Sequence, residues 1–303
     1  MSFNMLLGVQ PGLSQMPGGR AFGQDDAIML PLTFSRGYCS FPFLAQLHYL
    51  MRSGDHTSMT YVPFFVHGEN RSSRWLITCD HATNTVPPDL GGTLGLPDAD
   101  MSRHIAYDLG AAGVTRALAD ALNAPAILSN FSRLVIDPNR GEDDPTLLMR
   151  LYDGSVIPGN RNADAEEKER RLNAYYRPYH EALSELAARR DDTVIVAIHS
   201  FTRQLKSRPS RPWHVGILHA YDRRLSDPLI AALEAEPDLV VGRNEPYPGH
   251  LPGDAVDRHA LHHGRLNTLI ELRNDLIETE AAQAAWGERL APMLISALTQ
   301  VAD

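Results

Sequence analysis

Two histidines and a glutamate stand at the ends of apolar runs, where side chains of these types could act together in chemistry. His81 ends one run, His199 follows residues 193–198, and Glu271 ends a third run. Five of the six residues in 193–198 are β-branched, which predicts a buried strand of a parallel sheet. Open α/β sheets place their sites at the carboxyl ends of the strands. The three side chains are therefore expected to meet at one edge of a sheet.

The two histidines suggest a catalytic zinc site. Imidazole is a preferred zinc ligand, and catalytic zinc takes about three protein ligands and keeps one open position. Asn84, three residues after His81, occupies the spacing at which a glutamate usually joins its histidine on the metal. The predicted ligands are therefore His81, Asn84 and His199. An amide oxygen is a weaker ligand than a carboxylate, so three alternatives for the third ligand stay open: Asp80, His104 and Asp108.

Glu271 is predicted to be the general base. A free carboxylate at the end of an apolar strand is costly to bury. Partial burial would move its pKa toward neutrality, which suits a group that deprotonates water beside a metal ion. The alternative is an ion pair with Arg273, two residues on and on the same face of the strand.

Asn139 and Arg140 place an amide and a guanidinium in one loop. A guanidinium binds a carboxylate through paired hydrogen bonds, so these two residues are predicted to bind the substrate carboxylate. Arg133, at the start of the preceding apolar run, is a further candidate for substrate binding. The alternative is a structural loop in which Asn139 and Arg140 pair with Asp137 or Glu142.

The remaining histidines are interpreted as structural or solvated. His180 lies in a predicted helix far from any strand end, which indicates helix packing. His259, His262 and His263 form a local cluster whose loop context indicates an exposed surface.

The elements that must position these residues alternate between strands and helices, which predicts an α/β fold with one doubly wound, mostly parallel sheet flanked by helices. Pro178 should kink or split its helix, because proline cannot donate the backbone hydrogen bond. The expected strands are residues 75–79, 126–128, 131–136, 193–198, 215–218 and 266–271, and the expected helices are 98–122, 163–190, 228–236 and 279–298.

Composition is ordinary for a soluble globular protein. The chain has 303 residues, enough for a sizeable core, and 43% are hydrophobic. A net charge of −9 argues against a nucleic-acid partner but permits a small anionic substrate in a locally basic pocket. Two cysteines, no apolar stretch of membrane-spanning length and no secretory signal make a cytoplasmic protein the expectation.

Residues 1–70 differ from the rest, being rich in Gly, Pro, Ser and Met without a sustained period. They are interpreted as a poorly ordered N-terminal extension before a domain at 71–303. Met59 is an alternative start of translation, which would remove residues 1–58. Another alternative is an arm that packs on a second subunit of a homo-oligomer.

Five motifs in order along the chain resemble the N-formylglutamate amidohydrolase family. They are DHATN at 80–84, SRLVIDPNR at 132–140, YRPYH at 176–180, IHS at 198–200 and NEPYPG at 244–249. The resemblance covers about residues 74–298, and the family is similar in turn to the zinc carboxypeptidases, which have a doubly wound α/β fold. It implies zinc binding by His199, substrate carboxylate binding by Asn139 and Arg140, and catalysis by Glu271. Asn84 departs from the carboxypeptidase pattern, which has a glutamate there.

The reaction implied by the resemblance is metal-dependent hydrolysis of N-formyl-L-glutamate to formate and glutamate. Glu271 would act as base toward the attacking water and return the proton to the leaving amine. A second basic group, either Arg133 or one of those at 203–211, would hold the side-chain carboxylate. N-acetyl and N-succinyl substrates would need only a wider pocket.

Two other functions remain open. One is a metallocarboxypeptidase that acts on peptides. The other is an inactive relative that binds N-acyl amino acids or a protein partner, which Asn84 supports and Glu271 argues against.

Overall fold

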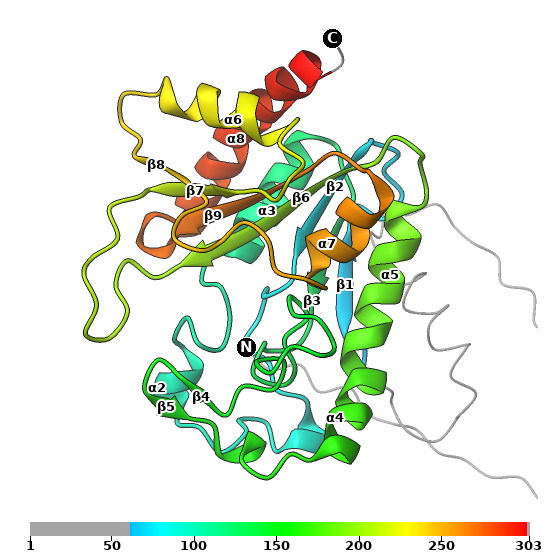
Figure 1. Cartoon of the computed structure of the whole chain (residues 1–303), viewed down its shortest axis with the longest axis vertical. Helices are drawn as coiled ribbons and strands as arrows, with labels where there is room; N and C mark the ends of the chain where they lie inside the picture. Colours follow the sequence, from blue (N-terminus) through cyan, green and yellow to red (C-terminus); the bar gives the residue numbers. More distant parts are fainter. Residues whose placement is uncertain (1–60, 302–303) are drawn as a thin grey trace, which may run out of the picture. The chain divides into compact units, whose positions relative to one another are not determined.

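A seven-stranded sheet runs through the part of the chain that the computed structural model describes, residues 61–301 (Figure 1). Its order is β1-β3-β2-β6-β9-β7-β8. The central strands β3, β2, β6 and β9 are parallel to one another, whereas β1 and β7 run antiparallel to their neighbours β3 and β9. The strands are β1 Phe64–His67, β2 Trp75–Cys79, β3 Ala126–Ser129, β6 Val194–Phe201, β7 Val215–Leu218, β8 Val241–Arg243 and β9 Asn267–Arg273.

Helices cover both faces of this sheet, so the predicted α/β fold, a mostly parallel sheet flanked by helices, is confirmed. A two-stranded hairpin, β4 Leu151–Tyr152 and β5 Ser155–Val156, stands apart from the sheet. Within residues 61–301, no helix combines the length and apolar character needed to cross a bilayer. The α-helices are α2 Asp98–Met101, α3 Ala111–Ala121, α4 Ala165–Arg171, α5 Arg177–Ala187, α6 Ser226–Glu234, α7 Ala255–His259 and α8 Glu280–Val301. Short 3₁₀ turns cover Pro88–Leu90, Pro158–Asn160, Leu261–His263 and Asn274–Leu276.

The alternation of side chains along β6 and β9 decides which face carries the site. Ile198 and Ile270 belong to the core between the sheet and α3, α6 and α8. Their neighbours His199 and Glu271 must point to the opposite face, because successive side chains of a strand alternate. That face is covered by α5 and α7, and Ala197 and Leu269 pack there.

The sheet begins earlier than the expected domain boundary at residue 70. β1 lies at Phe64–His67 and pairs antiparallel with β3, so its residues belong to the folded domain and not to the N-terminal extension. The strand is only four residues long and is followed by a polar turn, so its sequence shows no sustained alternation. Residues 1–60, which make up most of the expected extension, lie outside the described part of the chain.

The single helix expected over 98–122 is wrong. The chain forms the short α2, leaves helical geometry for residues 102–110, and resumes as α3. Gly110 precedes α3 with a positive φ of 78°, a conformation that glycine adopts without steric cost. The intervening loop crosses the sheet edge, where the backbone N–H of Asp108 donates to the carbonyl of His81.

Residues 131–136 are buried as expected but form turns instead of a strand. Side chains satisfy their backbone carbonyls, which a neighbouring strand would otherwise do. Asn160 donates to the Leu134 carbonyl and the buried Arg171 donates to the Val135 carbonyl. An apolar run therefore predicted burial correctly and its backbone conformation wrongly.

The helix expected over 163–190 is split near Pro178, as predicted. A π-helical turn at Leu172–Tyr176 separates α4 from α5, and Pro178 falls in the first turn of α5. Proline fits there because the first N–H groups of a helix have no partner within it.

Candidate active site

His81 and His199 come from adjacent strands at the carboxyl edge of the sheet. β2 ends at Cys79, two residues before His81, and β6 carries His199 near its own end. The chain leaves β2 through α3 and returns to the sheet as β3 on one side, whereas β6 lies on the other side of β2. This reversal creates the crevice in which α/β proteins commonly bind ligands.

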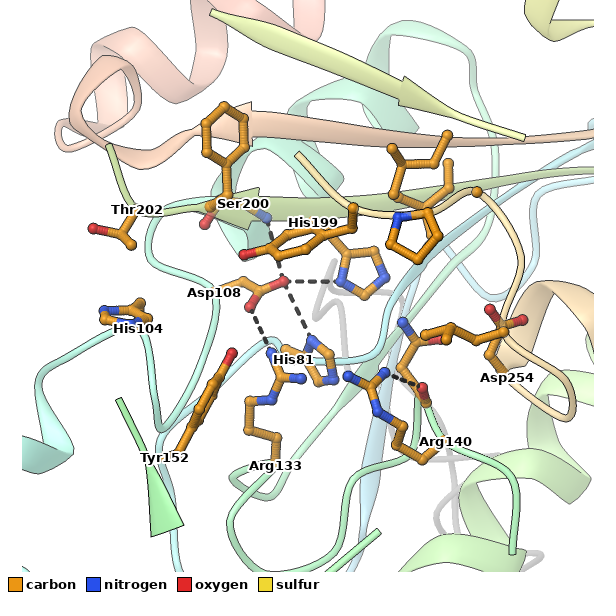
Figure 2. A pocket seen from close by; sticks show the side chains of 18 residues that line it. His81, His104, Asp108, Arg133, Arg140, Tyr152, His199, Ser200, Thr202 and Asp254 are labelled. Carbon is orange, nitrogen blue, oxygen red and sulfur yellow. Dashed lines mark hydrogen bonds and ion pairs between the residues drawn. The ribbon is translucent and has the colours of Figure 1, made fainter. Parts of the chain in front are cut away.

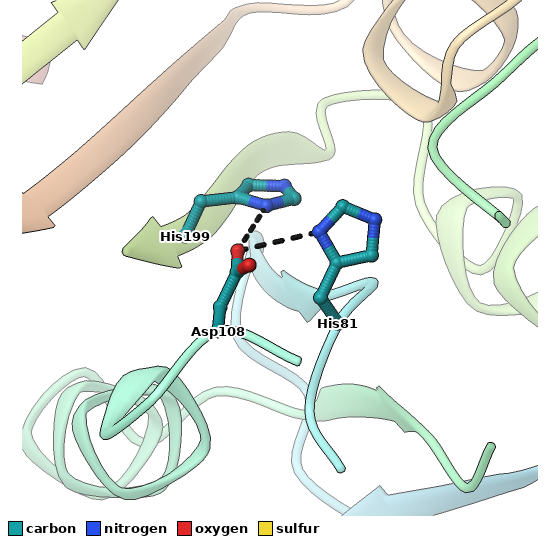
Figure 3. Close-up of side chains that lie close together, drawn as sticks. All are labelled: His81, Asp108 and His199. Carbon is teal, nitrogen blue, oxygen red and sulfur yellow. Dashed lines mark hydrogen bonds and ion pairs between the residues drawn. The ribbon is translucent and has the colours of Figure 1, made fainter. Parts of the chain in front are cut away.

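Asp108 joins the two histidines into one group (Figure 3). Its Oδ2 atom lies 2.8 Å from His199 Nδ1 and 3.3 Å from His81 Nδ1. The same oxygen accepts a hydrogen bond from the Ser200 backbone N–H at 3.2 Å. One ligand atom from each of the three side chains lies within 4.8 Å of the others, and all three side chains are buried. Among residues 61–301 this is the group of histidine and carboxylate side chains that could hold a metal ion.

A second layer of carboxylates fixes the outer nitrogen of each imidazole. His81 Nε2 lies 2.7 Å from Asp137 Oδ1, and His199 Nε2 lies 3.2 Å from Asp80 Oδ2. Tyr179 in turn donates to Asp80 Oδ1 at 2.6 Å. Metal-binding histidines commonly have such a partner, which fixes the ring orientation and raises the basicity of the ligand atom.

Burial and close charges shift the pKa values of Asp108 and His199. Burial alone would raise the pKa of Asp108, but the two histidines outweigh it and hold that pKa well below its usual range. Burial alone would lower the pKa of His199, and its hydrogen bonds to Asp108 and Asp80 raise it instead. A buried carboxylate is thus kept ionised between two inward-facing nitrogen atoms.

These side chains fit a divalent cation. Two imidazole nitrogens and one carboxylate are a ligand set typical of catalytic zinc. Both Nδ1 atoms converge on Asp108 while each Nε2 atom contacts a different outer carboxylate, so the inner nitrogens are the ones that could share a metal ion with Asp108. The arrangement can supply three ligands and leave a position toward the pocket.

Asn84, the predicted third ligand, has a different partner. Its amide Nδ2 donates to the Met101 carbonyl at 2.9 Å. Of the alternatives from the sequence, Asp108 belongs to the group with His81 and His199, Asp80 lies behind His199, and His104 lines the same pocket as this group.

Glu271 stands beside His199 in the sheet, since the two residues are paired in the β6–β9 register. It is buried, and its Oε2 atom has no hydrogen-bond partner among the described residues. Burial raises its pKa to about 8, and the nearby Asp108 charge adds to this, although His199 opposes it. The alternative partner Arg273 pairs with Asp275 at 2.7 Å. One oxygen of the Glu271 carboxyl group is thus left without a hydrogen-bond partner on the strand next to His199.

The three residues predicted to bind substrate line one pocket with the two histidines (Figure 2). The guanidinium of Arg133 is already paired with carboxylates of the protein. It donates twice to Asp137 Oδ2 and lies 3.5 Å from Asp108 Oδ1. Arg140 donates to the Thr146 hydroxyl and to its neighbour's carbonyl, with no carboxylate partner among residues 61–301. The Asn139 side chain accepts a hydrogen bond from the Ala255 N–H. Of the two arginines, Arg140 is thus the one whose guanidinium is not paired with a carboxylate of the described chain and could bind an anion.

The interpretation of His259 as a solvated residue is wrong. His259 is buried and stacks on His180, with 2.9 Å between His180 Nδ1 and His259 Nε2. Burial lowers the pKa of both rings, to about 4 for His259. His180 packs between helices as expected, while His262 remains exposed. The sequence could not reveal this pair, because its members lie 79 positions apart.

Comparison with known proteins assigns this chain to a family. Residues 73–278 match the family model described as N-formylglutamate amidohydrolase. The chain belongs to the N-formylglutamate amidohydrolase family. The resemblance inferred from the motifs is thereby confirmed, and the family assignment makes the protein an amidohydrolase.

Solved structures also match this amidohydrolase. The gene product Atu2144 of Agrobacterium tumefaciens is 37% identical, with a TM-score of 0.76 over 80% of this chain and 97% of that one. The N-formylglutamate amidohydrolase of Ralstonia eutropha JMP134 is 21% identical, with a TM-score of 0.51 over 80% of this chain and 99% of that one. A metallo-carboxypeptidase of Pseudomonas aeruginosa matches at 12% identity and a TM-score of 0.39, over 85% of this chain and 68% of that one. The search of curated proteins gave no match.

Proposed function

We propose that this amidohydrolase uses a divalent metal ion, zinc, to hydrolyse N-acyl amino acids, with N-formyl-L-glutamate as the leading substrate. The observation that carries the proposal is the convergence of His81, Asp108 and His199 beside an unpartnered Glu271. The family assignment supports an amide as the bond that is cleaved.

In this proposal Asp108 takes the place expected for Asn84 as the third ligand. A carboxylate is a stronger ligand than an amide for a hard or borderline cation. A divalent ion held by these residues would polarise the amide carbonyl and make a nearby water molecule more acidic. Asp80 and Asp137 would keep the imidazole rings in orientation.

Glu271 moves the proton. Water forms the new bond to the carbonyl carbon as Glu271 accepts the water proton on its carboxylate. Glu271 then gives that proton to the amide nitrogen as the C–N bond breaks, which releases the acid and the free amino acid. A cation bound beside it would lower its pKa from about 8, so the carboxylate would be ionised near neutral pH.

Arg140 and Asn139 orient the substrate in this scheme. The guanidinium of Arg140 has no carboxylate partner among the described side chains, and both residues line the same pocket as His81 and His199. A substrate carboxylate bound there would place the adjoining amide near the ligand group. Arg133, paired with Asp137, would act mainly by holding that carboxylate in place.

The proposal is tested by formate release from N-formyl-L-glutamate by the purified protein. We expect release that stops after chelation and returns when zinc is added. Absence of release with zinc, manganese or cobalt would refute formyl-glutamate hydrolysis. A panel of N-acetyl and N-succinyl amino acids in the same assay then decides whether another acyl group is the substrate.

The Glu271→Gln variant tests whether Glu271 acts in catalysis and not in substrate binding. Gln keeps the size of the side chain but cannot accept the proton, so we expect kcat to fall by about 10²–10⁴-fold. Calorimetry should still show binding of N-formyl-L-glutamate with a Kd close to that of the wild type. Unchanged kcat would contradict the role of Glu271 as base.

A further inference from the structure

One guanidinium behind the pocket wall has no carboxylate to neutralise it. Arg211 donates to the Thr202 carbonyl at 3.1 Å and to the Tyr247 hydroxyl at 3.2 Å. Its guanidinium carbon lies 5.0 Å from the centre of the Tyr247 ring and 5.7 Å from that of Phe201. These three neighbours all line the pocket that contains His81 and His199. Within residues 61–301 no acidic side chain forms an ion pair with Arg211.

The other basic side chains of the same loop are directed elsewhere. Arg203 and Arg208 are exposed, and Arg203 lies 3.9 Å from Asp275. Lys206 is exposed beside the hairpin turn at Gly154. Arg211 is therefore the cation through which this loop can act on the pocket.

The pocket wall also carries a histidine with one ring nitrogen that has no hydrogen-bond partner. The Nε2 atom of His104 is buried and makes no hydrogen bond within the described chain, although Asp153 Oδ2 lies 3.4 Å away. His104 lines the pocket beside Tyr152, with its ring edge-on at 6.0 Å. Burial lowers the pKa of His104, Asp153 opposes this shift, and the positive charges of Arg103, Arg133 and Arg211 add to it. Of these three cations, Arg103 and Arg133 are already paired with carboxylates.

His104 and Tyr152 lie across the pocket from Arg140. Figure 2 shows His104, Tyr152 and Thr202 on one side of the Asp108–His199 pair, and Arg140 and Asp254 on the other. The pocket thus has an unneutralised cation on one side and another behind the opposite wall, with the proposed metal ligands between them. A ligand with two carboxylates matches this distribution of charge.

We propose that Arg211, together with His104 and the Tyr247 hydroxyl, forms a subsite for a second carboxylate of the substrate. This inference rests on the proposed function and specifies its substrate class: N-acyl amino acids that carry two negative charges. Arg140 binds the α-carboxylate, and the Arg211 subsite selects for the other. That second carboxylate belongs either to the amino-acid side chain, as in N-formyl-L-glutamate, or to the acyl group, as in N-succinyl-L-alanine.

The test compares matched substrates in the wild type and in Arg211→Met. N-formyl-L-glutamate is paired with N-formyl-L-glutamine, and N-succinyl-L-alanine with N-butyryl-L-alanine. The wild type is expected to prefer one dianion over its neutral-ended partner in kcat/KM. Arg211→Met should lower kcat/KM for that dianion by about 10- to 100-fold and leave the monoanion nearly unchanged. The pair that responds identifies where the second carboxylate lies.

Arg208→Met is the matched control, because Arg208 is an exposed arginine of the same loop. It should leave the preference intact. Arg211→Lys keeps the positive charge and serves as a second variant if Arg211→Met does not fold; it should retain part of the preference. An unchanged dianion preference in folded Arg211→Met, or equal loss in Arg208→Met, would overturn the subsite.

Binding separates failure of the subsite from failure of the proposed function. If the wild type hydrolyses none of the four compounds, the proposed function fails. Calorimetry with the same four compounds then tests the subsite alone. Tighter binding of a dianion that is lost in Arg211→Met supports it, and equal binding of dianions and monoanions refutes it.

Discussion

Asp108 is the residue on which the two histidines converge. One of its oxygens receives His81, His199 and the Ser200 N–H within 3.3 Å. A buried carboxylate with this many donors stays ionised, as its lowered pKa indicates. In the proposed enzyme it supplies the negative charge that a divalent cation needs among two neutral ligands.

Asp108→Asn and Asn84→Ala should therefore differ in zinc binding. Asparagine keeps the shape of Asp108 but loses its charge, so we expect zinc affinity to fall by at least about 100-fold, beyond the effect of removing an outer-shell partner. Asn84→Ala removes a hydrogen bond to a backbone carbonyl, so its zinc affinity should stay close to that of the wild type. Competition with a chromophoric chelator measures both. Equal loss of zinc in the two variants would return Asn84 to the ligand set.

The sequence predicts some of these residues well and others poorly, for physical reasons. His199 and Glu271 could be placed because strand periodicity fixes both their position and their face. Asp108 could be named only as an alternative, because it reaches the site from a loop that local spacing cannot orient. The His180–His259 pair depends on tertiary packing, which no local pattern reveals.

At the scale of elements, the loop between α2 and α3 places Asp108 beside His81 and His199. Gly110 has a φ of 78°, and a Cβ there would lie 2.3 Å from the Ile277 carbonyl oxygen. The loop is thus held against the segment that follows β9. Its Asp108 N–H also bonds to the His81 carbonyl, so its position is coupled to β2.

Gly110→Ala should disturb this loop more than a comparable substitution elsewhere. Gly264 has a φ of 64° with open space around it, so Gly264→Ala carries only the backbone cost of about 1–2 kcal/mol. Gly110→Ala adds the clash with Ile277, so its loss in free energy of unfolding should be larger and should be accompanied by weaker zinc binding. Denaturant unfolding and chelator competition measure these effects. Equal losses of stability and intact zinc binding in both variants would contradict the coupling.

Strands and helices with a clear period could be predicted from the sequence, and the breaks between them could not. Residues 131–136 satisfy the burial pattern of a strand, yet side chains of Asn160 and Arg171 bind their carbonyls. The helix expected over 98–122 has the right apolar spacing but the wrong backbone at 102–110. Long-range hydrogen bonds decided both cases.

At the scale of the whole molecule, the site lies where two cores meet at the sheet edge. The core under α3, α6 and α8 and the core under α5 bury opposite faces of the same strands. The sequence predicted this layered fold because apolar strands alternate with amphipathic helices. Titratable groups are buried on the α5 face, and they make stability depend on pH.

His259 provides a test of this dependence. Burial lowers its pKa from 6.5 to about 4, so between these pH values the unfolded chain binds a proton that the folded chain does not. Its contribution therefore makes the free energy of unfolding fall as pH falls through this window, by about 3 kcal/mol in total. Glu271 and Asp254 have raised pKa values and act in the opposite sense. The difference between variants isolates His259.

His259→Gln, which retains a polar partner for His180, should lose this contribution. The stability of the metal-free wild type relative to His259→Gln should decrease as pH falls from 7 to 4. Urea unfolding at a series of pH values gives this difference. A difference that is constant across the window would show that His259 titrates normally in the folded protein.

The central claim, that His81, Asp108 and His199 hold the catalytic metal, is tested most directly by a crystal structure of the zinc-loaded protein with anomalous diffraction at the zinc edge. We predict one strong peak about 2.0–2.2 Å from His81 Nδ1, His199 Nδ1 and an Asp108 oxygen, the usual ligand distances for zinc. A peak on the Nε2 side of the imidazoles, a peak bound by Asn84 in place of Asp108, or no peak at this edge of the sheet would contradict the account.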